Sequence, residues 1–114
     1  MEKVTELAFK LHDLLLSSEQ YLNLKVAEDN MNNDENASLL IQNYHKLQEL
    51  SHNNKMEELN KKLHEAKLKM DLNPYVIEYK KAYKEYQILV GKITSIVFKD
   101  FSTISTLDKI LKSR

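Results

Sequence analysis

The hydrophobic positions of this chain recur mainly at steps of three and four residues, the period of amphipathic α-helices. The clearest such stretch begins at Asn73-Pro74. Asparagine before proline is typical of a helix start, because the asparagine can accept hydrogen bonds from the first free N–H groups and proline has none to leave unpaired. The pattern predicts one long helix up to Val97. Its apolar seam consists of Val76, Tyr79, Tyr83, Tyr86, Val90, Ile93 and Val97.

A second apolar row lies beside this seam at a spacing of seven residues. Its members are Tyr75, Ala82, Leu89 and Ile96. The buried face of the helix is therefore predicted to be broad enough for more than one neighbouring helix.

The N-terminal third predicts a first helix over Glu2–Leu16, with Val4, Leu7, Leu11 and Leu14 on one seam. Residues 17–19 are compatible with a local break, a new cap or a continuing helix. Apolar character continues to about residue 28. The Asn- and Asp-rich segment 29–36 is predicted to be a loop, with Asn33 or Asp34 capping the next helix.

In the middle of the chain, the apolar pattern predicts helical segments before and after residues 51–54, where the pattern is interrupted by polar residues. A kink and a short loop are both compatible with it, and a short disturbance within an antiparallel hairpin arm is favoured. The helix should end before Asn73, because the residue ahead of a proline is pushed out of helical geometry. Ser105 and Asp108 resemble a cap before a short C-terminal helix.

Composition agrees with this pattern. The 114 residues include one glycine and one proline, too few for the turns of a β or α/β fold. We therefore predict an all-α fold of long antiparallel helices forming a helical bundle, with residues 1–114 as a single domain.

The absence of cysteine excludes disulfides, thiolate metal sites and thiol catalysis. No apolar run approaches the ~20 residues that span a bilayer, so membrane insertion is not expected. The N-terminus lacks the basic segment and apolar core of a signal peptide. A cytoplasmic location is the expectation.

Candidate chemistry is sparse. The four histidines are scattered, and His45 and His52 have only Glu49 between them as a further ligand, whereas zinc sites need three or four convergent ligands. Adjacent acids such as Glu57 and Glu58 point in different directions on a helix. Gly91 alone cannot build a phosphate loop. We assign no catalytic, metal or cofactor-binding residue and expect no cofactor and no enzymatic activity.

The lysines and tyrosines of the long helix support two interpretations. RNA-binding proteins combine basic residues with stacking rings, so Lys80, Lys81 and Lys84 could form a direct RNA-binding face. Zero net charge and a single arginine argue against direct nucleic-acid binding.

The favoured interpretation is a protein interface. Tyrosine is enriched at interfaces because its ring is apolar and its tip polar. A monomeric core with the hydroxyl groups at its rim remains the alternative. The predicted assembly residues are Tyr79, Tyr83, Tyr86, Val90 and Ile93.

Several segments in order resemble the YlbF/YmcA family of small helical bacterial regulators, which includes YheA-like proteins. The resemblance covers nearly the whole chain. It is carried by Ser18-Glu19-Gln20-Tyr21-Leu22-Asn23-Leu24-Lys25, Asn33-Asp34-Glu35-Asn36-Ala37, Tyr44-His45-Lys46-Leu47-Gln48-Glu49-Leu50 and Leu72-Asn73-Pro74-Tyr75-Val76-Ile77-Glu78-Tyr79, followed by Ala82, Glu85, Leu89 and Ile93.

The resemblance implies a non-enzymatic adaptor that forms homodimers, higher homo-oligomers or complexes with related subunits. It implies a role in competence, sporulation or biofilm control, through messenger-RNA processing by endoribonuclease Y. Some members carry a cysteine-rich tail implicated in iron–sulfur binding. That property is not carried over to this chain, which has no cysteine.

Overall fold

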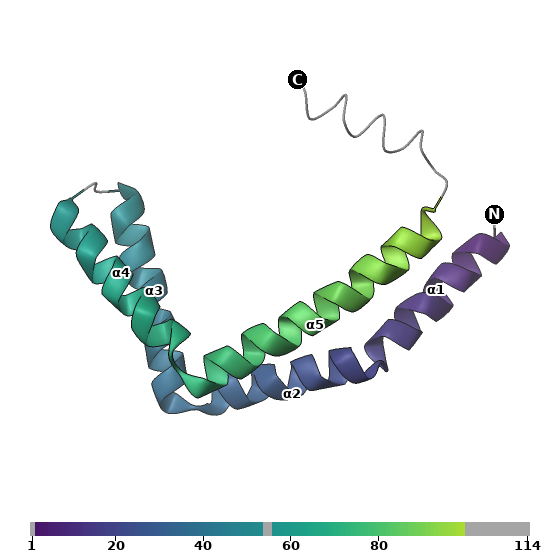
Figure 1. Ribbon diagram of the computed structural model, residues 1–114, viewed down its shortest axis with the longest axis horizontal. Helices are drawn as coiled ribbons and strands as arrows, with labels where there is room; N and C mark the ends of the chain where they lie inside the picture. The colour runs from purple at the N-terminus through teal and green to yellow at the C-terminus, as the bar shows by residue number, and fades with distance from the viewer. Residues whose placement is uncertain (1, 54–55, 100–114) are drawn as a thin grey trace, which may run out of the picture.

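A computed structural model describes residues 2–53 and 56–99, and Figure 1 shows five helices in this part of the chain. All described secondary structure is helical, which confirms the predicted all-α fold. The helices are α1 (Glu2–Leu16), α2 (Glu19–Asn33), α3 (Glu35–Asn53), α4 (Glu57–Asp71) and α5 (Pro74–Val97).

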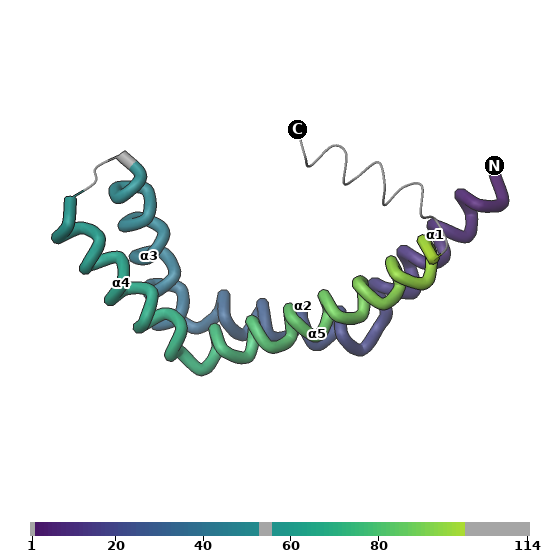
Figure 2. Tube along the Cα trace, turned by 45° about the horizontal axis from the view of Figure 1, so that its top comes forward, coloured from purple at the N-terminus to yellow at the C-terminus, as the bar shows by residue number. Residues whose placement is uncertain are grey.

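The helices form two antiparallel pairs that meet at an elbow. Helix α2 packs along α5, and α3 packs along α4 (Figure 1). Helix α1 continues beyond the far end of α2. The two views agree that the result is an open, bent shape (Figure 2). The radius of gyration is 19.6 Å, against about 13 Å for a compact domain of this length.

Side-chain hydrogen bonds explain where α5 and α3 begin. The Asn73 Oδ1 atom accepts hydrogen bonds from the N–H groups of Tyr75 (2.9 Å) and Val76 (3.3 Å), and Pro74 opens α5, as predicted. Asp34 accepts a 2.8 Å hydrogen bond from the Ala37 N–H, so it is the predicted cap before α3.

The segment 17–19 contains a break. Helix α1 ends at Leu16, and the Ser18 Oγ atom accepts a hydrogen bond from the Tyr21 N–H at 3.2 Å. Ser18 is therefore a new N-cap, and the continuing-helix alternative is wrong. A full capping box would have glutamate or glutamine three residues after Ser18, where this chain has Tyr21. The serine side chain alone is therefore enough to cap the new helix.

The loop predicted over residues 29–36 is wrong for most of its length. Helix α2 continues through Asn33, and only Asp34 separates it from α3. Ala27, Glu28 and Met31 are half-buried, so packing sustains the last turns of α2. Helix propensity is a weak preference, and tertiary contacts override it here.

The weak stretch at residues 51–54 lies where α3 ends, at Asn53. Helix α4 begins at Glu57 and runs back along α3, which confirms the predicted antiparallel hairpin arm. The predicted C-terminal helix around Ser105 and Asp108 lies outside the described residues.

The core is thin. Among the described apolar residues, those classed as buried are Leu24, Ala37, Ala66, Val76 and Ala82. Three of these five are alanines, so helices approach closely but bury little area. None of the described helices is both long and apolar enough to cross a bilayer.

Replacing Asn73 with alanine should lower the free energy of unfolding by about 1 kcal/mol, because two N–H groups at the start of α5 lose their acceptor. Urea denaturation at fixed protein concentration measures the change. Asn43→Ala, at an exposed position within α3, is the matched control and should not destabilise the protein. Equal unfolding midpoints for the Asn73 variant and the wild type would contradict the capping role.

Candidate interaction surfaces

The tyrosines of α5 are divided between contacts within the chain and the surface. The ring of Tyr86 lies against that of Tyr21 on α2, with centroids 5.6 Å apart. Tyr79 and Tyr83 stack along α5 at 6.1 Å. Tyr79 and Tyr86 are half-buried, whereas Tyr83 is 44% exposed. One predicted assembly residue therefore has a partner on α2, while Tyr83 presents much of its ring to solvent.

The other two predicted assembly residues, Val90 and Ile93, are half-buried on the same helix. Nearby, Ile88, Ile96 and Val97 are exposed. The C-terminal half of α5 therefore leaves large apolar side chains uncovered. This half of the helix continues past the junction of α1 with α2 (Figure 1).

Helix α1 also has an uncovered apolar face. None of its residues is buried. Val4 is 70% exposed, Leu7 58% and Leu14 66%. These residues belong to the seam predicted for the first helix, so the seam exists but residues 2–53 and 56–99 leave most of it uncovered. Leu11, the fourth residue of the seam, is half-buried. Scattered exposed apolar residues are ordinary, whereas three exposed residues on one helical face indicate an interaction site.

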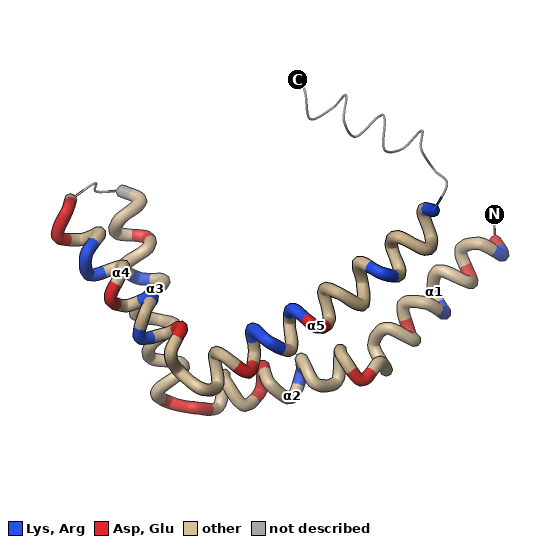
Figure 3. The backbone as a smooth tube through the Cα atoms, viewed as in Figure 1, with Lys and Arg blue, Asp and Glu red and all other residues tan. Residues whose placement is uncertain are grey.

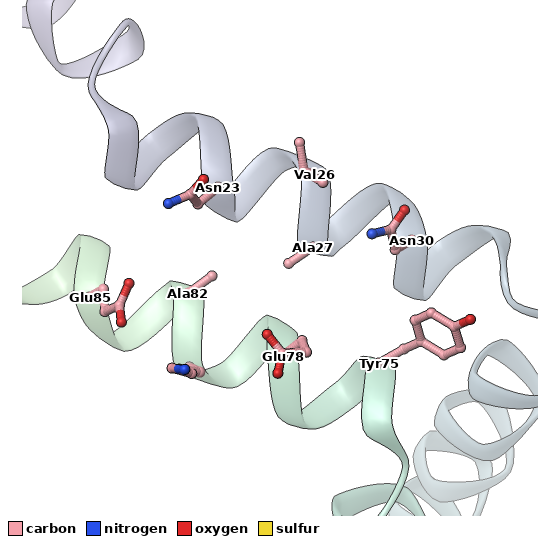
Figure 4. Close-up of a pocket in the computed structure, with 9 residues that line it drawn as sticks. Asn23, Val26, Ala27, Asn30, Tyr75, Glu78, Ala82 and Glu85 are labelled. Carbon is pink, nitrogen blue, oxygen red and sulfur yellow. The ribbon is translucent and has the colours of Figure 1, made fainter.

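A groove of about 380 Å³ lies on one side of the α2–α5 pair. Ala27 and Ala82 point toward one another across it (Figure 4). Its other lining residues are Asn23, Val26, Asn30, Tyr75, Glu78, Lys81 and Glu85. The lining thus combines small apolar side chains with polar and charged groups, and it includes none of the five predicted assembly residues.

Sequence reasoning missed this groove, because its lining comes from two helices whose pairing is not local. A signal was present, however. Asn23 and Asn30 are seven residues apart, as are Glu78 and Glu85, so each pair repeats on one face of its helix. The antiparallel pairing of α2 with α5 brings the two repeats together (Figure 4).

The lysines proposed for RNA binding do not form a purely basic patch, because acidic residues lie beside them. Lys80 is ion-paired with Asp71, and Lys81 lines the groove together with Glu78 and Glu85. Figure 3 shows acidic and basic residues intermixed along this part of α5. Phosphate groups would therefore compete with carboxylates already in place.

Asp71, at the end of α4, joins the two arms electrostatically. The hydrogen bond from Lys80 on α5 is the main cause that lowers the pKa of this carboxyl, and Lys67 adds to it at 3.7 Å. A depressed folded-state pKa stabilises the fold above the ordinary aspartate pKa of about 4. That stabilisation is lost as the pH falls through the lower, folded-state value.

Asp71→Asn should therefore destabilise the protein modestly at neutral pH, and the difference from wild type should shrink as the pH falls below about 4. Urea midpoints measured across this pH range test the expectation. A difference that stays constant with pH would show that the ionised carboxylate is not its cause.

Among the described residues, no three histidine, aspartate or glutamate side chains gather as a metal site would require. The candidate sites of the described chain are therefore surfaces: the apolar face of α1, the exposed part of α5 and the groove between α2 and α5.

Comparisons with known proteins agree with this arrangement. Residues 4–102 match the family described as "Control of competence regulator ComK, YlbF/YmcA". Among solved structures, the chain is similar to one described as Bacillus subtilis RicA in complex with RicF, with 22% identity and a TM-score of 0.81. That match covers 90% of this chain and 96% of the other. Among proteins with curated functions, none matches.

The structural likeness shows a shared helical fold, and the sequence match covers most of the chain. The match also includes the capped starts of α2, α3 and α5. The chain therefore belongs to the YlbF/YmcA family, whose description is control of the competence regulator ComK.

Proposed function

We propose that this chain is a non-enzymatic cytoplasmic adaptor that acts by helix-mediated association with a second copy of itself. We further propose that it supports competence, sporulation or biofilm control through endoribonuclease Y-dependent messenger-RNA processing, and that residues 1–114 act as one domain. The family description and the resemblance support the regulatory role. The absence of cysteine is compatible with a reducing compartment.

The observation that carries the proposal is the amount of uncovered apolar surface. Among the described residues, Val4 is 70% exposed, Leu14 66% and Ile96 73%, although all three side chains are apolar. Helix α1 buries no residue, and α5 exposes large apolar side chains toward its end. An isolated chain would keep these faces in water, and association would remove them from it.

The relative RicA was solved in complex with RicF, which also supports association as the mode of action. For this chain, the interface is proposed to include Tyr79, Tyr83, Tyr86, Val90 and Ile93 together with the seam of α1. Tyr83 supports this assignment best, because its ring is large and 44% exposed.

Replacing Tyr83 and Val90 together with aspartate should weaken self-association, because two carboxylates would have to be desolvated at the interface. Light scattering gives the molar mass of wild type and variant, and circular dichroism shows whether the variant remains helical. Tyr83→Phe with Val90→Ile is the apolar control and should assemble like the wild type. A folded monomer for both the wild type and the aspartate variant would refute the proposal.

The same preparations distinguish the adaptor from an RNA-binding protein. Filter binding across a salt series should give no useful RNA affinity even at low salt, since the lysine face also carries acids. Tight binding with a steep salt dependence would overturn this expectation.

A further inference from the structure

We propose that the groove between α2 and α5 holds α1 of a second copy of this chain, through charge pairs formed by Lys3 and Lys10 with Glu78 and Glu85. This inference rests on the proposed function, since it specifies where the second copy binds. No described helix occupies the groove, and no residue of α1 is buried. Two carboxylates and one cation, Lys81, line the groove, and α1 carries two lysines at a matching spacing.

The groove has the form of a seat for a helix. Ala27 and Ala82 lie at its centre and point toward one another, and side chains this small let a third helix approach closely (Figure 4). Glu78 and Glu85 stand two helical turns apart on α5, about 10 Å along the axis. Within the described residues, neither carboxylate takes part in an ion pair or side-chain hydrogen bond.

Helix α1 carries the complementary pattern. Lys3, Leu7 and Lys10 have the spacing i, i+4, i+7, which places them in one stripe along a helix. Glu78, Ala82 and Glu85 have the same spacing on α5. A helix laid in the groove with Leu7 over the alanines would thus bring both lysines to the two carboxylates. Leu7 is 58% exposed, so it is available for this contact.

The occupant must come from another copy. Within one chain, Leu7 precedes Ala27 by twenty residues along two helices that follow each other end to end, a separation of about 30 Å. Figure 1 shows α1 leading away from α2 at the end of α2 that is farther from the elbow. In a two-fold dimer the contact occurs twice, because each copy supplies one α1 and one groove.

Charge reversal tests this seat directly. One variant carries Lys3→Glu with Lys10→Glu, and another carries Glu78→Lys with Glu85→Lys. In a dimer of either variant alone, α1 and the groove would carry charges of the same sign at both contacts. Self-association of each variant should therefore weaken at least tenfold. Mixed together they should form a heterodimer of near wild-type affinity, because both seats then join opposite charges. Sedimentation velocity with one variant fluorescently labelled measures each affinity.

The control is Lys61→Glu with Lys62→Glu, the same change of charge on the exposed side of α4, and it should leave association unchanged. Restored association on mixing the two variants supports binding of α1 in the groove of the second copy. If the single variants associate like the wild type, the groove is not the seat, although the proposed function stands. If mixing fails to restore association, the partner's α1 does not occupy the groove. A wild type that never self-associates overturns both the seat and the proposed function.

Discussion

Replacing Leu24 with alanine is expected to lower the free energy of unfolding by about 2–3 kcal/mol, a large part of the total stability of so small a protein. Leu24 is 8% exposed, and it lies one helical turn after Tyr21, whose ring contacts Tyr86 on α5, so the two side chains share a face of α2. Truncation removes apolar contact and leaves a cavity between the two helices.

The matched control is Leu22→Ala on the same helix, at a side chain that is 52% exposed. Its effect should be well below 1 kcal/mol, because little contact is lost. Urea denaturation followed by circular dichroism, at one protein concentration for all variants, gives both values. Equal losses at the two positions would mean that the α2–α5 contact does not form the core described here.

Placing aspartate at both Val4 and Leu14 is expected to weaken self-association at least a hundredfold. Each side chain is more than half exposed in the single chain, so its burial would occur at an interface. Burying one such side chain contributes about 1.5–3 kcal/mol, and two together correspond to a factor of a hundred or more. The fold of the single chain should persist, because α1 buries none of its residues.

Sedimentation equilibrium measures this change, with circular dichroism to verify helicity. Val4→Ile with Leu14→Met keeps both positions apolar and should leave the dissociation constant nearly unchanged. An aspartate variant that assembles like the wild type would remove α1 from the interface and would confine association to α5.

Local sequence signals located the helix starts well. Asn73-Pro74 and Asp34 act through hydrogen bonds to residues two or three positions away, so the sequence alone could identify them. The segment 29–33 was misassigned for the opposite reason. Its polar composition favours a loop, but Met31 is half-buried and Asn30 lines a groove with Tyr75, so packing against residues distant in sequence keeps it helical.

The candidate surfaces likewise depend partly on local sequence signals and partly on contacts between residues distant in sequence. The spacing of apolar residues predicted the apolar faces of α1 and α5. It could not predict which of these faces packs against another helix of the same chain. Tyr86 lies against Tyr21, and that contact depends on how α2 pairs with α5. The groove at Ala27 and Ala82 depends on the same pairing, which is why the residues of one helix could not reveal it.

If a second copy covers the apolar faces of this chain, the protein must self-associate in solution. The most direct test is the molar mass of the wild-type protein by light scattering, over about 1 to 100 µM, the range in which micromolar association is visible. The molar mass should rise with concentration to at least twice the 13.4 kDa of the single chain. A well-folded helical protein that stays at 13.4 kDa throughout would contradict it.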